Sequence, residues 1–176
     1  MTSNGPEASP ASDPQEPETQ APAAFGAVTL CAGTGSGTLL ALSEPLSFWG
    51  GTDRDTGVII DTHHPQRGTP MGGRVLLMDA SRGSSSSSSV LAEQLRAGVG
   101  PSAIVLTARD AIVCLGVLAA AELYGNQIPV VLLAQADADR LHHGAGPACV
   151  SVTAAPDGSA AVVLSPEKPG RQDPQR

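Results

Sequence analysis

A run of six serines, Ser84–Ser89, is the part of the sequence best placed to do chemistry. The apolar segment Val75–Met78 precedes it, the loop Asp79–Gly83 joins the two, and an amphipathic segment follows without a spacer. A strand, a glycine-containing loop and a helix in this order expose hydroxyl and N–H groups that favour an anion. From the residues alone three interpretations stay open: a flexible linker, an anion-binding turn and a catalytic serine.

Two histidine pairs are further candidates. His63 and His64 follow Asp61 and could supply a general base or a ligand. An exposed turn in which hydrogen bonds satisfy both imidazoles is the alternative. His142 and His143 stand near several glycines, so we expect a solvated loop there.

Two glycine-containing motifs have weaker chemical interpretations. Gly33–Gly37 resembles part of a dinucleotide-binding loop, but no βαβ unit and no acidic residue follow at the expected places, which favours a bend in a strand. Phe48–Gly51 is typical of a hydrophobic anchor or an interface contact, with substrate contact as the alternative. The sequence contains no GxSxG motif, so an α/β-hydrolase triad is not supported.

Composition excludes several classes of function. The formal charge is −7 and only four residues are aromatic, which argues against nucleic acid as a partner. No run approaches the roughly 20 apolar residues that span a bilayer, and we expect no membrane association. The cysteines, three in number, stand far apart without the spacing of a metal site, so we expect free thiols, no metal bound by this chain, and a cytoplasmic location without a secretory signal.

The order of elements predicts an α/β domain over residues 25–164. Residues 1–24 and 165–176 are poor in large apolar side chains and are expected to be disordered tails. The strand-rich first half and the alternating second half favour a sandwich-like β portion with βα units packed on it. The predicted strands are Ala27–Cys31, Thr38–Ser43, Val58–Asp61, Arg74–Met78, Ala103–Leu106, Ile128–Leu133 and a hairpin of Val150–Thr153 with Ala160–Leu164, and the predicted helices are Val90–Ala97 and Asp110–Tyr124.

Several motifs in a fixed order carry a family resemblance. They are Leu42–Gly51 (LSEPLSFWGG), Thr56–Asp61 (TGVIID) with His63–Gln66 (HHPQ), Gly73–Leu76 (GRVL) and Ser81–Ser86 (SRGSSS). Together they resemble the small, swivelling part of the aconitase X family, over roughly residues 26–135.

The resemblance implies a fold, a partner and a reaction. The fold would be a swivelling β/β/α domain, the aconitase-like small domain, which closes over a separate large subunit. That subunit would carry the iron or iron-sulfur centre, with no cofactor bound by this chain. The reaction would be that of a heteromeric hydro-lyase acting on a small carboxylate, cis-3-hydroxy-L-proline, to give pyrroline-2-carboxylate. The alternatives are the small subunit of phosphomevalonate dehydratase and a non-catalytic anion-binding module.

The resemblance also assigns roles to residues. In the wider aconitase superfamily a Gly-Ser-Ser loop carries the serine that removes a proton from the substrate, and Gly83-Ser84-Ser85 matches it, so Ser84 is the expected catalytic base. Ser85, Arg82 and His64 are the expected substrate-binding residues. The superfamily places a carboxylate-gripping arginine after the serine pair, where this chain has Ser86.

Overall fold

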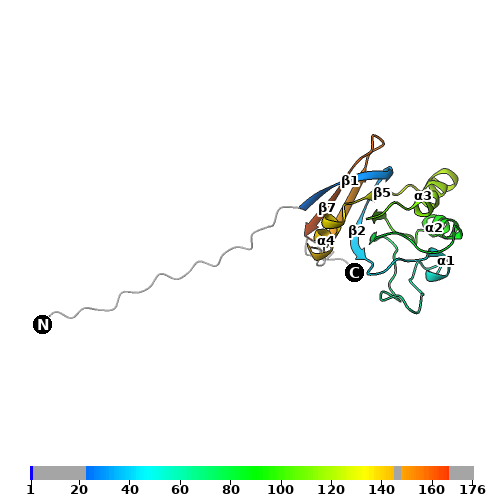
Figure 1. Cartoon of the computed structure of the whole chain (residues 1–176), viewed down its shortest axis with the longest axis horizontal. Coiled ribbons are helices and arrows are strands. Elements are labelled where there is room, and N and C mark those ends of the chain that lie inside the picture. Colours follow the sequence, from blue (N-terminus) through cyan, green and yellow to red (C-terminus); the bar gives the residue numbers. More distant parts are fainter. Residues whose placement is uncertain (2–22, 145–147, 167–176) are drawn as a thin grey trace, which may run out of the picture.

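Seven strands form one closed barrel in the order β1-β5-β4-β3-β2-β6-β7 within the described part of the chain. The computed structural model describes residue 1 and residues 23–144 and 148–166. Helices α2 and α3 pack together on one side of the barrel, and α4 lies beside β1 and β7 (Figure 1). The elements are β1 (Ala23–Cys31), β2 (Gly33–Ala41), α1 (Phe48–Gly51), β3 (Val75–Met78), α2 (Ser86–Arg96), β4 (Ala103–Leu106), α3 (Ala111–Tyr124), β5 (Val130–Leu132), α4 (Gln135–Gly144), β6 (Ala148–Ala154) and β7 (Ser159–Pro166).

Strands β2, β3, β4 and β5 run parallel, and the two in the middle are buried on both faces. Successive side chains of a strand point to opposite faces. Leu76 and Ile104 accordingly pack in the cluster that includes α2 and α3, whereas Val75 and Val105 pack in the cluster with β6 and β7. The uninterrupted apolar sequences of β3 and β4 therefore suit strands that are covered by helices outside and by the barrel interior inside.

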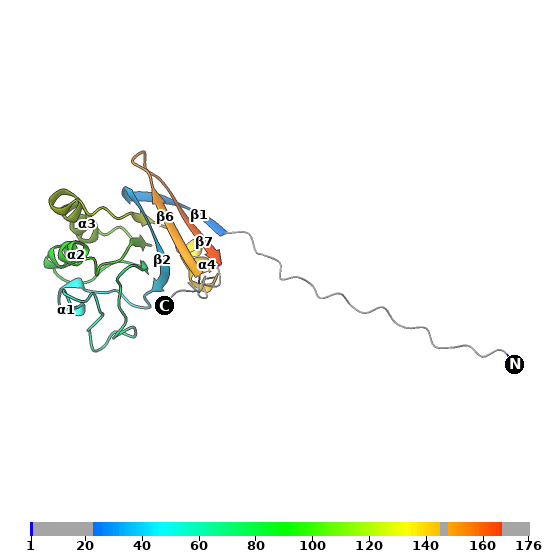
Figure 2. The same cartoon turned by 180° about the vertical axis from the view of Figure 1, so that it is seen from behind.

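The prediction of an α/β domain is confirmed, but the sandwich-like β portion is wrong. Strand β1 pairs with both β5 and β7, and β2 pairs with both β3 and β6. Because these two long strands each use both edges, the parallel strands and the β6–β7 hairpin close into one sheet. Figure 2 shows β1, β6 and β7 on the side of the barrel away from α2 and α3.

Several predicted boundaries also differ from the structure. Val58–Asp61 forms only isolated bridges with Thr52 and Pro70 rather than a strand. Helix α2 begins at Ser86 instead of at the predicted Val90. His142 and His143 lie in helix α4, so the loop predicted there is wrong. The helix was missed because its apolar face is short, with only Ala138 and Leu141 buried.

The ends of the domain extend slightly beyond the predicted limits. Strand β1 begins at Ala23 and β7 ends at Pro166. The remainder of the predicted tails, 2–22 and 167–176, lies outside the described residues.

Barrel closure requires glycine where β2 passes close to other backbone. A Cβ atom at Gly35 would lie 2.0 Å from the carbonyl oxygen of Ser102, whereas one at Gly26 in β1 would meet nothing within 4 Å. The Gly-rich segment 33–37 therefore belongs to a strand in close contact with its surroundings.

We predict that Gly35→Ala destabilises the domain and that Gly26→Ala does not. The new methyl group at residue 35 overlaps a backbone oxygen, and overpacking of this kind costs about 1–3 kcal/mol. Urea unfolding followed by circular dichroism measures both variants against the parent. Equal midpoints for the two variants would contradict the close approach of β2 to Ser102.

Candidate functional site

The loop between β3 and α2 carries the expected catalytic serine at the carboxyl ends of the parallel strands. Gly83 in this loop has a φ of +106°, which favours glycine. A Cβ atom there would lie 2.8 Å from the Ser47 hydroxyl. Ser47 thus packs against the loop. Both the backbone conformation and the close approach of Ser47 explain why residue 83 is a glycine.

Asp110 fixes the start of this loop. Its Oδ2 accepts hydrogen bonds from the N–H and the hydroxyl of Ser81 at 2.6 and 2.5 Å. Its Oδ1 accepts from the N–H groups of Ile112 and Val113 at 2.9 and 3.0 Å, which caps helix α3. Burial by itself would raise the pKa of Asp110, but the hydrogen bonds from Ser81, Val113 and Ile112 outweigh burial and hold the pKa below its usual range. One buried carboxylate therefore joins the loop to α3.

Arg82 is held by two contacts at the middle of the loop. The Arg82 guanidinium pairs with the Asp61 carboxylate at 2.5 Å. The backbone N–H of Arg82 donates to the Leu46 carbonyl at 3.1 Å. The N–H of His63 and then the Arg82 side chain lower the pKa of Asp61. The Arg82 side chain remains 45% exposed, so part of the guanidinium still faces solvent.

His64 is buried and its ring is engaged on both sides. The Nδ1 atom accepts the N–H of Gln66 at 3.1 Å, and Nε2 lies 3.2 Å from the carbonyl oxygen of Glu44. A neutral ring with the proton on Nε2 satisfies both contacts. His64 therefore connects two loop segments, while His63 is exposed. Substrate binding by His64 stays a prediction.

The serine run divides into an exposed and a structural part. Ser84, Ser85 and Ser86 are exposed, and the Ser86 N–H lies 3.3 Å from the Ser84 hydroxyl oxygen. Ser87 is buried and accepts the N–H of Trp49 at 3.2 Å, and Ser88 donates to the Ser85 carbonyl at 2.7 Å. The linker interpretation is wrong because most of the run is the first turn of α2.

The exposed serines stand at the N-terminal end of an eleven-residue helix. This end carries partial positive charge, and the first turn of α2 contains no acidic residue. The arrangement offers an anion a place next to the Ser84 and Ser85 hydroxyls. Ser84 and Arg82 thus belong to one short loop. His64 holds the segment around Glu44, whose residue Leu46 bonds to Arg82 in this loop.

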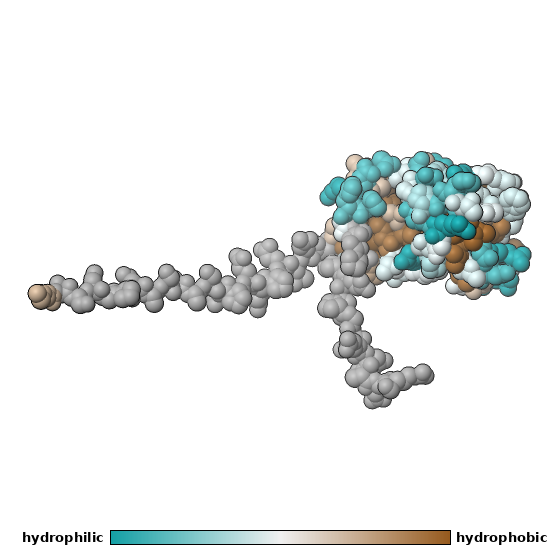
Figure 3. All heavy atoms as spheres, turned by 90° about the horizontal axis from the view of Figure 1, so that it is seen from below, coloured by the Kyte–Doolittle hydropathy of each residue, from teal (hydrophilic) through white to brown (hydrophobic). Residues whose placement is uncertain are grey.

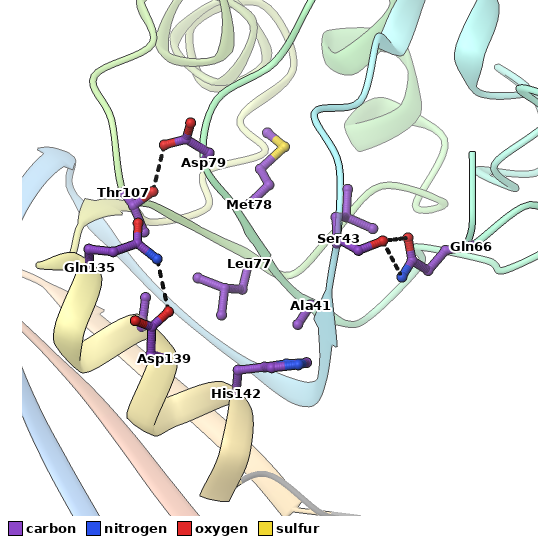
Figure 4. A pocket seen from close by; sticks show the side chains of 12 residues that line it. Ala41, Ser43, Gln66, Leu77, Met78, Asp79, Thr107, Gln135, Asp139 and His142 are labelled. Carbon is purple, nitrogen blue, oxygen red and sulfur yellow. Dashed lines mark hydrogen bonds between the residues drawn. The ribbon is translucent and has the colours of Figure 1, made fainter. Parts of the chain in front are cut away.

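Sequence reasoning missed a cavity of about 400 Å³ beside the loop. It lies where β2, β3 and β4 end and is closed on one side by α4 (Figure 4). The polar side chains that line it include Ser43, Gln66, Asp79, Gln135, Asp139 and His142. The sequence did not predict this cavity, because Gln135, Asp139 and His142 lie in α4, a helix that was not predicted.

The described residues contain no group of three or more His, Cys, Asp or Glu side chains placed to hold a metal ion. None of the helices in the described ranges is long and apolar enough to cross a membrane. Cys31, Cys114 and Cys149 are free thiols.

Comparison with known proteins first identifies the class of domain. The structure of aconitase X from Thermococcus kodakaraensis matches this fold with a TM-score of 0.67 and 26% sequence identity, over 81% of this chain and 99% of that chain. The family model "Aconitase X swivel domain" matches residues 25–159. The architecture is thus that of a swivelling domain, and the chain belongs to the aconitase X family.

Individual relatives match about half to three fifths of the chain. Proteins named cis-3-hydroxy-L-proline dehydratase from Hypocrea jecorina and Pseudomonas aeruginosa are 45% and 44% identical over 62% and 61% of this chain. This match spans only 18% of the length of each of those two relatives. The phosphomevalonate dehydratase small subunit of Methanothermobacter thermautotrophicus is 38% identical over 50% of this chain and 67% of its own.

We predict that Asp110→Asn destabilises the domain at neutral pH and loses this effect in acid. A folded-state pKa below the unfolded value means that the carboxylate stabilises the fold above about pH 4, and that this stabilisation is lost as the pH falls through the folded-state pKa. The expected difference at pH 7 is about 1–3 kcal/mol, because the amide oxygen of asparagine can still cap α3 but its NH2 group cannot accept the two hydrogen bonds from Ser81, which leaves those donors without their partner.

Urea unfolding of Asp110→Asn and the parent, from pH 7 to pH 3, measures this difference. The matched control is Asp55→Asn, since the Asp55 side chain is 80% exposed. A difference between Asp110→Asn and the parent that is absent at pH 7, or that grows in acid, would show that Asp110 does not anchor the loop as a carboxylate.

Proposed function

We propose that this chain is the small subunit of a heteromeric hydro-lyase that dehydrates cis-3-hydroxy-L-proline to pyrroline-2-carboxylate, with Ser84 as the base. The observation that carries the proposal is the exposed Ser84 hydroxyl at the start of α2, on a loop anchored by Asp110 and Arg82. The names of two relatives at 45% and 44% identity supply the reaction.

Ser84 would act on the carbon next to the substrate carboxylate. Its oxygen, as alkoxide, accepts the proton from this carbon, and the electrons of the C–H bond form a carbon–carbon double bond. The bond from the neighbouring carbon to the hydroxyl oxygen breaks, so that the elements of water are lost. The resulting cyclic enamine isomerises to pyrroline-2-carboxylate.

A serine is a weak base at neutral pH, so the alkoxide needs stabilisation. The Ser86 N–H, 3.3 Å from the Ser84 oxygen, is one donor placed for this purpose. The N-terminal end of α2 adds partial positive charge. Exclusion of water when a partner covers the exposed loop would strengthen both effects.

Ser85, Arg82 and His64 would bind or position the substrate. Ser85 stands beside the base and exposes its hydroxyl. The exposed part of the Arg82 guanidinium is available to a carboxylate while Asp61 holds the rest. His64 acts by keeping the segment around Glu44 in place.

A large subunit would provide the remainder of the active site. Most of the length of the two dehydratase relatives lies outside the matched region. An iron or iron-sulfur centre would belong to that large subunit, as membership of the aconitase X family implies. Trp49 is 61% exposed, and its backbone N–H donates to the Ser87 hydroxyl. Its side chain is therefore a suitable contact for a partner next to the loop. Free thiols favour the cytoplasm as the compartment.

Two alternative functions have specific support. One relative named phosphomevalonate dehydratase small subunit is 38% identical to this chain over 50% of its length. A non-catalytic module that holds an anionic metabolite at the start of α2 would use the partial positive charge of this helix end.

We predict that Ser84→Ala abolishes dehydration by the complex of this chain with its large subunit. Loss of a general base lowers kcat by about 100-fold or more. Ser89→Ala is the matched control, because Ser89 is exposed within α2 and lies outside the loop. The assay follows formation of pyrroline-2-carboxylate from cis-3-hydroxy-L-proline.

The same preparation distinguishes the alternatives. Turnover of phosphomevalonate but not of hydroxyproline would replace the proposed substrate. A stable chain that associates with no dehydratase subunit would favour the binding module. Activity of Ser84→Ala close to that of Ser89→Ala would remove Ser84 from the mechanism.

A further inference from the structure

Two of the cysteines, Cys31 and Cys114, lie together between β1 and α3. Cys31 is the last residue of β1 and is 4% exposed, and its Sγ atom lies 3.9 Å from the carbonyl oxygen of Cys114. Both side chains pack in the apolar cluster that includes α2 and α3. The fold thus brings together two thiols that are 83 positions apart in the chain. Cys149 lies instead on β6, on the side of the barrel away from α3 (Figure 2).

An irregularity at the end of β1 turns Cys31 toward the helix. Phe25 and Ala27 of this strand pack in the cluster with β6 and β7, and regular alternation would place Cys31 on the same side. Cys31 packs in the opposite cluster because the pairing of β1 with β5 shifts register between Thr29 and Cys31. A shift of this kind re-aims a side chain. The thiol pair therefore depends on a particular feature of the strand.

The two thiols differ in reactivity. The hydrogen bond with Cys31 lowers the pKa of Cys114, burial and Asp110 raise it, and Arg109 lowers it, with a net decrease. The same hydrogen bond and burial raise the pKa of Cys31. Cys114 also belongs to the first turn of α3, where its N–H donates to the Asp110 carbonyl at 3.2 Å, and the start of a helix favours a thiolate. Cys114 is therefore the nucleophilic thiol, half-buried beside a fully buried one.

The surface of α3 around Cys114 is apolar. Leu115 and Leu118 are 56% and 52% exposed, and Glu122 is the first charged residue of the helix. Exposed apolar side chains are not particular to α3, since Figure 3 shows apolar residues reaching the surface among polar ones on one face of the domain. The formal charge of −7 disfavours an anionic oxidant such as glutathione disulfide. A small uncharged oxidant, hydrogen peroxide, suits these surroundings.

We propose that Cys114 and Cys31 form a peroxide-sensitive pair, in which Cys114 is oxidised first and Cys31 converts it to a disulfide. A reactive thiol next to a resolving thiol is the arrangement of redox-sensing cysteines. The inference goes beyond the proposed function and does not depend on it. The pair stands within one helical turn of Asp110, the residue that anchors the serine loop.

The reaction consumes one peroxide for each disulfide. The Cys114 thiolate attacks one peroxide oxygen, so that an S–O bond forms and the O–O bond breaks. The hydroxide that leaves takes up the proton lost from Cys114 and becomes water. The Cys31 sulfur then attacks the Cys114 sulfenic acid, an S–S bond forms, and the hydroxyl group leaves as water with the Cys31 proton. Both cysteines are oxidised, and the peroxide is reduced to two molecules of water.

Mass spectrometry of the full chain after treatment with hydrogen peroxide tests the inference. N-Ethylmaleimide then blocks the remaining thiols, and trypsin separates the three cysteines because arginines stand between them in the sequence. We expect a disulfide that links the peptides of Cys31 and Cys114, with Cys149 recovered as the blocked thiol. Cys114 should lose its thiol about tenfold faster than Cys149, because Cys31 and the start of α3 favour its thiolate.

Variants separate the roles of the thiols. In Cys31→Ser the sulfenic acid of Cys114 should persist and be trapped by dimedone, since no resolving thiol is present. Cys149→Ser is the matched control and should form the same disulfide as the parent. Absence of the dimedone adduct from a folded Cys31→Ser chain would overturn the assigned order of the two thiols.

The parent chain alone is sufficient to overturn the inference, whether or not Cys31→Ser folds. Oxidation of Cys149 as fast as Cys114, or oxidation without a link between Cys31 and Cys114, would contradict it. The preference for Cys114 should disappear in concentrated urea, where the fold no longer holds the pair together. An equal preference in urea would assign it to the local sequence and would also overturn the inference.

Discussion

The hydrogen bonds accepted by the Asp110 carboxylate connect the start of the loop between β3 and α2 to the start of helix α3. Ser81 and the first turn of α3 both donate to this one group. Because the carboxylate is buried, its bonds are protected from competition with water. A loop that follows a strand is ordinarily free to move, and here its first residues are tied to the helix packed beside α2. The position of Ser84 thus depends on a residue 26 positions further along the chain.

Charge is arranged locally rather than by the net balance of the chain. A formal charge of −7 would discourage anionic substrates if it were evenly spread. Asp61 and Arg82 neutralise one another beside the loop, and no acidic residue occupies the first turn of α2. The unneutralised carboxylates of Asp79 and Asp139 lie at the cavity instead.

Local patterns predicted those elements whose sequence and surroundings agree. Strands β3 and β4 are apolar throughout because both faces are covered, and α3 has a helix cap at Asp110 and a glycine at its end. The closed barrel depends on long-range pairing of β1 and β2, which no local pattern encodes. Helix α2 begins at Ser86 although serine has a weak helix propensity, because tertiary packing overrides that propensity. The hydrogen bond from the Trp49 N–H to the buried Ser87 hydroxyl is one of these tertiary contacts. The role of Ser84 came from family resemblance, and the cavity could not be found without α4.

The exposure of the serine loop is consistent with a domain whose chemistry is completed elsewhere. Burial of a hydroxyl raises the cost of its ionised form, so a partner that merely covered Ser84 would make it a weaker acid and its alkoxide harder to form. The Ser86 N–H and the end of α2 act in the opposite direction, and their effect grows as water is excluded. In the proposed reaction, closure by a partner therefore favours the alkoxide only if the donors keep their positions, and a firmly anchored loop then matters more than a preformed pocket around the serine.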